Sequence, residues 1–72
     1  MTQYLVVIEQ GSESFGAYVP DLPGCVTTGT SPDEALQLMR EAIALHIEAM
    51  ARDGQPVPAP TSRGAVVDIG AA

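Results

Sequence analysis

The single cysteine and the single histidine of this chain are the residues with the most direct route to catalysis. Cys25 attacks a substrate only as a thiolate, which needs a base such as His46 or an electropositive setting. Three basic residues against nine acidic ones favour the opposite, so we predict a partly buried, structural cysteine. His46 is expected at the boundary of an interface. One cysteine and one histidine supply neither a disulfide nor a zinc ligand set.

Carboxylates are the other groups that could do chemistry, as metal ligands or as acid and base. Asp33 and Glu34, however, fall at a predicted helix start, where negative charge stabilises the helix terminus. Glu41 and Glu48 fall on the polar side of the same helix. We therefore predict no catalytic site, no metal site and no cofactor.

Size and charge narrow the classes of function further. Seventy-two residues hold one small domain with a thin core, which favours stabilisation by a partner subunit. The net charge of −6 repels the negatively charged phosphates of nucleic acids, so direct nucleic-acid binding is not expected. The sequence also lacks a run of about 20 apolar residues and a signal-peptide pattern. The expectation is a soluble, cytoplasmic protein without membrane contact.

Three strands are predicted before the helix, and one after it. Residues 3–9 and 15–19 are rich in β-branched and aromatic residues and flank a turn-forming segment, which indicates a hairpin. The first strand is apolar on both faces, a pattern typical of a central strand. Further strands are predicted over 25–29 and 65–69. Residues 20–25 form a rigid Pro-rich loop, whose one carboxylate suits either a binding surface or a capped turn.

Ser31, Pro32 and Glu34 form a capping box, which predicts a helix from this point to about Asp53, with Gly54 ending it. Apolar residues cover roughly 200° of this helix, where a helix on a sheet needs little more than 100°. The stripe expected to face the sheet contains Leu36, Met39, Ile43, Ile47 and Met50. A second stripe is predicted to be an oligomer interface, unless the C-terminal segment folds over it: Leu38, Ala42, Leu45 and Ala49.

Several runs resemble the N-terminal domain of HicB-type antitoxins. They are Tyr-Leu-Val-Val-Ile-Glu (4–9), Phe-Gly-Ala-Tyr-Val-Pro-Asp-Leu-Pro-Gly-Cys (15–25), Thr-Gly (28–29) with Pro-Asp-Glu-Ala-Leu (32–36), and the later pieces 41–46 and 53–58. The resemblance covers residues 3–60. It implies a single α+β domain of βββαβ order, with a partial ribonuclease-H-like sheet and one long helix packed on it.

The resemblance also implies a function. HicB-like antitoxins neutralise HicA-type toxins, small basic proteins that cleave mRNA, by covering the toxin's active site, and they commonly assemble as oligomers. We therefore expect a toxin partner and a homodimer or homotetramer. Residues 1–72 are interpreted as the antitoxin domain without the C-terminal DNA-binding domain that many members carry. The hypothetical toxin-binding residues are Tyr18, Val19, Asp21, Leu22 and Gly24.

Two alternatives stay open at this point. One is a degenerate ribonuclease-H-like hydrolase or small-ligand-binding domain that uses its own carboxylates, with Glu9 as the candidate on the first strand. Such chemistry needs several carboxylates converging on two metal ions. The other is an orphan HicB-like protein without a toxin. We favour the binding module, which is not an enzyme, because an acidic surface complements a basic toxin.

Overall fold

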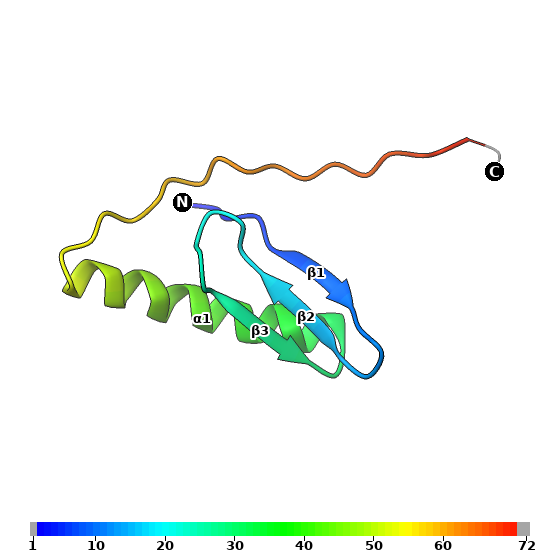
Figure 1. Cartoon of the computed structure of the whole chain (residues 1–72), viewed down its shortest axis with the longest axis horizontal. Helices are drawn as coiled ribbons and strands as arrows, with labels where there is room; N and C mark the ends of the chain where they lie inside the picture. Colours follow the sequence, from blue (N-terminus) through cyan, green and yellow to red (C-terminus); the bar gives the residue numbers. More distant parts are fainter. Residues whose placement is uncertain (1, 71–72) are drawn as a thin grey trace.

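The computed structural model describes residues 2–70, which form three strands and one helix: β1 (Val7–Gln10), β2 (Phe15–Tyr18), β3 (Val26–Gly29) and α1 (Pro32–Arg52). The strands form an antiparallel sheet in the order β1-β2-β3, and α1 lies along one face of it (Figure 1). This arrangement confirms the predicted α+β class, with one long helix packed on the sheet.

β1 differs from the first predicted strand in both length and place. Its register pairs Val7 with Tyr18, and continuing that register would place Leu5 opposite Pro20. Proline has no N–H to donate to a ladder, so pairing begins only at Val7. β1 is also an edge strand, with β2 in the centre of the sheet. The prediction of a central first strand is therefore wrong for the isolated chain.

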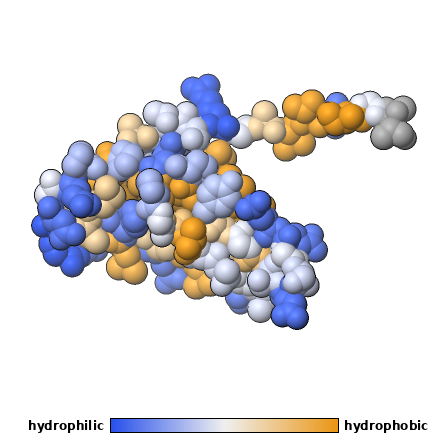
Figure 2. Space-filling model, viewed as in Figure 1, coloured by the Kyte–Doolittle hydropathy of each residue, from blue (hydrophilic) through white to orange (hydrophobic). Residues whose placement is uncertain are grey.

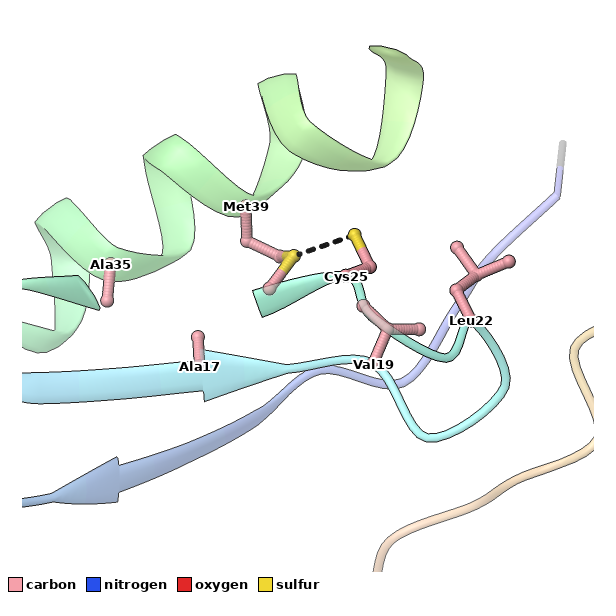
Figure 3. Close-up of a cluster of buried hydrophobic side chains, with 6 residues drawn as sticks. All are labelled: Ala17, Val19, Leu22, Cys25, Ala35 and Met39. Carbon is pink, nitrogen blue, oxygen red and sulfur yellow. Dashed lines mark hydrogen bonds between the residues drawn. The ribbon is translucent and has the colours of Figure 1, made fainter. Parts of the chain in front are cut away.

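The core lies between the sheet and the helix, and loop residues close one end of it (Figure 3). At β3, a Cβ on Gly29 would lie 2.7 Å from the backbone nitrogen of Ala35, so glycine is needed for α1 to come this close. Met39 and Leu22 are the largest side chains that are fully buried. The buried core consists of Ala17, Val19, Leu22, Cys25, Ala35 and Met39.

Both ends of α1 lie where the sequence predicts them. Ser31 Oγ accepts the backbone N–H of Glu34 at 3.1 Å. In return, Glu34 Oε1 accepts the N–H of Thr30 at 2.8 Å, one residue earlier than in a standard capping box. The chain leaves the helix through Gly54, whose φ of +70° lies in the left-handed region that favours glycine.

The segment after α1 runs back across the molecule in an extended form without regular secondary structure (Figure 1). Tyr4 ties it to the N-terminal segment, because its hydroxyl donates to the carbonyl of Pro58 at 2.6 Å. Within residues 2–70, the fourth strand predicted over 65–69 is not formed. A strand needs a neighbour to pair its N–H and C=O groups, and these residues diverge from β1 (Figure 1).

Replacing the N-cap residue of α1 tests whether the hydrogen bond between Ser31 Oγ and the Glu34 N–H stabilises the fold. Ser31→Ala removes the acceptor for the Glu34 N–H and should cost about 1 kcal/mol. For a domain of this size the melting midpoint should fall by roughly 4 to 8 °C, as measured by circular dichroism. Ser12→Ala, in the exposed hairpin turn, is the control and should leave the midpoint unchanged. An equal midpoint for both variants would contradict the capping role.

Candidate functional site

The loop between β2 and β3 is built as a closed, rigid unit. The Val19 N–H donates to the Cys25 carbonyl at 3.3 Å. Inside this closure, the Leu22 N–H donates to the Val19 carbonyl and the Cys25 N–H to the Leu22 carbonyl, both at 3.1 Å. Gly24 takes a φ of +83°, which side-chain-bearing residues rarely adopt. Two successive turns thus fix the loop from within, and the buried Leu22 anchors it to the core (Figure 3).

Asp21, at the tip of this loop, holds the C-terminal segment. Its carboxylate accepts four hydrogen bonds, from the backbone N–H and the hydroxyl of both Thr61 and Ser62, at 2.9 to 3.0 Å. We call residues 55–64 the strap. Tyr4 binds the strap at Pro58, and Asp21 binds it at Thr61 and Ser62.

These donors also set the charge state of the carboxyl group. The pKa of Asp21 is held below its ordinary value, chiefly because the Ser62 backbone N–H bonds to the charged form. Partial desolvation acts in the opposite direction, and the Ser62 hydroxyl and the Thr61 donors lower the pKa further. The strap and the ionised carboxylate therefore stabilise each other.

The five hypothetical toxin-binding residues are brought together, but they are not equally accessible. Tyr18 is 38% exposed and Gly24 is also exposed, whereas Val19 and Leu22 are buried in the core. The side chains of these two residues fix the shape of the loop from below. The exposed members of this set are therefore Tyr18 and Gly24, while Asp21 is partly buried and bonded to the strap.

The predicted oligomer stripe is partly exposed. Leu38 is 40% and Leu45 66% exposed, and Ala49 is also exposed. Ala42 differs, because it is partly buried and packs against the core. The helix thus presents two leucines on a flank that the sheet does not cover.

The cysteine lies in the core, and the histidine lies at its edge. Cys25 is buried, its Sγ–H donates to the Sδ of Met39 at 3.7 Å (Figure 3), and burial raises the pKa of the thiol. Cys25 is thus more deeply buried than the partly buried position that the sequence predicts. His46 is partly buried and lines a hollow of about 450 Å³ between the end of α1, the loop and the strap.

Across residues 2–70, no three His, Cys, Asp or Glu side chains gather closely enough to hold a metal ion. Glu9, the candidate of the hydrolase hypothesis, is exposed on β1. No helix within the same residues is long and apolar enough to cross a membrane.

The sequence analysis did not predict the hydrogen bonds between Asp21 and the strap. Their partners lie 40 and 41 residues apart in the chain, so no local pattern signals them. Two clues were present: adjacent hydroxyl residues, Thr61 and Ser62, directly after the alternating prolines, and an unpaired carboxylate in a rigid loop. Side-chain oxygens of this kind bond readily to nearby backbone N–H groups.

A three-stranded antiparallel sheet with one long helix packed on it defines a small α+β domain. Over residues 4–69 the chain matches the family described as the HicB-like antitoxins of bacterial toxin–antitoxin systems. The chain belongs to this family.

Relatives support the same placement. A solved HicA3 and HicB3 toxin–antitoxin complex contains a chain that is 35% identical, with a TM-score of 0.71, covering 83% of this chain and 70% of that one. A UPF0150 protein of Synechocystis is 39% identical over 56 residues, which are 76% of this chain and 71% of the relative. An uncharacterised protein of Haemophilus phage HP1 is 38% identical over 55 residues; the match spans 76% of this chain but only 41% of the phage protein.

Acidification should release the strap. Because the folded-state pKa of Asp21 lies below the ordinary value of 3.8, the strap bond contributes stability that is fully present above that value. It is lost as the pH falls through the lower, folded-state pKa. The amide proton signals of Thr61 and Ser62, followed by NMR, should shift toward unbonded positions over this range.

Substitution should reproduce the effect of acid at neutral pH. Asp21→Ala should move the Thr61 and Ser62 amide signals to unbonded positions at pH 7, because the acceptor is gone. Glu13→Ala, in the exposed hairpin turn, is the control and should leave them in place. Unchanged signals in Asp21→Ala would show that the strap is held by other contacts.

Proposed function

We propose that this chain is a non-enzymatic, cytoplasmic antitoxin that neutralises a HicA-type, mRNA-cleaving toxin by covering the toxin's active site. The observation that carries this proposal is the match of the sequence to the HicB-like antitoxin family, together with the match of the fold to a chain of a HicA3 and HicB3 toxin–antitoxin complex. The net charge of −6 supports it, since a basic RNA-cleaving toxin would be attracted to an acidic partner.

The β2 end and the loop that follows it form the proposed toxin-facing surface. The loop is fixed before any contact by its internal hydrogen bonds, so it loses little conformational entropy on binding. Tyr18 adds a half-exposed aromatic ring, a residue type that often anchors protein interfaces. The buried Val19 and Leu22 contribute to the proposed surface by fixing the shape of the loop, and Gly24 contributes through its left-handed backbone conformation.

We further propose that the antitoxin self-associates as a dimer or tetramer through the α1 flank that includes Leu38, Ala42, Leu45 and Ala49. Leu38 and Leu45 supply the apolar surface, and the exposed Ala49 lets a second helix come close because it is small, whereas Ala42 lies at the inner edge of this flank, against the core. Burying such leucines contributes roughly 1.5 to 3 kcal/mol each.

The toxin prediction is tested by co-expressing this chain with the products of the adjacent genes, among which the proposal requires a small basic protein. The two proteins should co-purify, the chain should stop RNA cleavage by its partner, and the association rate should fall as salt concentration rises. Tyr18→Ala should weaken the complex by about 1 to 3 kcal/mol in calorimetry, whereas Val57→Ala on the strap should not. A partner that cleaves RNA at full rate in the presence of excess chain would overturn the proposal.

The role of Asp21 in that complex is separable from its role in holding the strap. Asp21→Ala should weaken toxin binding by about 1 to 3 kcal/mol if the carboxylate meets an Arg or Lys of the toxin away from water. The double variant Thr61→Val, Ser62→Ala weakens the strap but keeps the carboxylate. Equal losses of affinity in the two variants would show that Asp21 acts only through the strap.

The helix prediction is tested by charge. The variant Leu38→Glu, Leu45→Glu should sediment as a smaller species than the unsubstituted chain at micromolar concentration, because buried unpaired charges are costly. Gln37→Glu and Ala44→Glu, on the polar side of α1, provide a matched control with the same added charge. Equal sedimentation of the unsubstituted chain and the leucine variant would contradict this interface.

A further inference from the structure

The end of the described chain carries an apolar extension, residues 65–69, which we call the arm. Val66 is 99%, Val67 71% and Ile69 82% exposed. Figure 2 shows this extension as an apolar rod that stands clear of the body of the molecule. The radius of gyration is 14.1 Å, whereas a compact chain of this length has about 11 Å. The arm therefore has strand-forming side chains and an extended backbone but no partner among residues 2–70.

The arm is a strand-like segment without a sheet, and β1 in turn has a sheet edge without a strand. Within the described residues β1 pairs only with β2, so one side of its backbone has no strand beside it. Ile8 faces the helix, since it pairs with the buried Ala17, yet it is 37% exposed because α1 packs mainly over β2 and β3. Residues 4–8, which lead into β1 and form its first half, are apolar on both faces. This pattern is typical of a strand with neighbours on both sides.

We propose that the arm of one copy adds as a fourth strand to the free β1 edge of a second copy, and that the exchange is reciprocal. Each chain carries both an unpaired strand and an unpaired edge, so two copies satisfy both in one closed, twofold arrangement. Each sheet then has the order β3-β2-β1-arm. β1 becomes central, Ile8 gains cover, and the valines of the arm leave water.

The base of the arm directs it away from its own sheet. Asp21 holds Thr61 and Ser62, and a Cβ on Gly64 would lie 3.3 Å from a methyl group of Leu5, so the strap is fixed against the N-terminal segment as far as Gly64. Beyond this point the chain diverges from β1 (Figure 1). The strap thus aims the arm outward, where a second copy can receive it.

Charge favours a second copy over a basic protein as the partner of the arm. A basic partner is recognised by clustered carboxylates, but the arm contains one acidic residue, Asp68, and Arg63 lies shortly before it. Strand addition depends instead on backbone hydrogen bonds and on apolar contacts of alternate side chains. The arm and β1 contribute one carboxylate each to this contact, Asp68 and Glu9.

Crosslinking between two differently tagged copies tests the exchange. A tagged full-length Glu9→Cys chain and an untagged Asp68→Cys chain are refolded together and treated with a short bis-maleimide. A tagged-to-untagged product is expected, because an arm from one chain lies beside β1 of the other. The unsubstituted chain is the control, since its one thiol, Cys25, is buried. A product of monomer mass from a single chain carrying both substitutions would overturn the proposal, because the arm would then pair with its own β1.

A second variant shows that the arm's apolar side chains hold the contact. Val67→Asp should lower the yield of the mixed product about tenfold, equivalent to about 1.4 kcal/mol. Val57→Asp places the same charge on an exposed valine of the strap and should leave the yield unchanged. Equal yields for the two variants, or a mixed product that forms only after the basic toxin is added, would overturn the exchange. Toxin neutralisation is measured separately, so its failure and the failure of the exchange are distinguishable.

Discussion

The close approach of α1 to β3 is the contact on which the rest of the structure depends. Gly29 leaves room for the backbone at Ala35, and the Thr27 hydroxyl donates to the Ala35 carbonyl at 3.1 Å. These contacts fix the direction of the helix at its first turn. Met39 then reaches Cys25 in the core, while Leu38 and Leu45 are left on the uncovered flank. The surface available to partners is thus set at the start of the helix.

The small size of the core explains why so much apolar surface is left over. Two of its six buried residues are alanines, and a chain of this length buries only about 60% of the surface that its unfolded form exposes. Leu38 and Leu45 on the helix flank, Ile8 on β1, and the valines and isoleucine of the arm all remain exposed. The chain closes part of this deficit itself, by binding the strap through Tyr4 and Asp21. The remaining surface is the physical basis for the proposed contacts between copies.

Features that depend on local chemistry could be predicted from the sequence, and those that depend on distant partners could not. Ser31 and Gly54 mark the helix ends because their bonds and backbone angles involve only near neighbours. The hairpin turn is equally local, since the Gly11 N–H donates to the Ser14 carbonyl. Whether β1 lies at the edge or in the centre of the sheet depends on which strands lie beside it. Whether residues 65–69 form a strand depends on the same thing. A one-chain pattern does not contain that information, and this is where prediction and structure differ.

At the candidate site, the sequence predicted the rigid loop at residues 20–25 but not that the Asp21 carboxylate in it binds the strap. An ionised carboxylate has about four acceptor positions, and the strap occupies four at Asp21. The carboxylate would still attract the proposed basic partner from a distance, because hydrogen bonding leaves it ionised. A direct bond to an arginine of that partner, however, would have to displace a donor from Thr61 or Ser62. A toxin at the proposed loop surface and the base of the arm would then compete for one carboxylate, and the proposed toxin binding would be coupled to the position of the strap and, through it, to the proposed contact between copies.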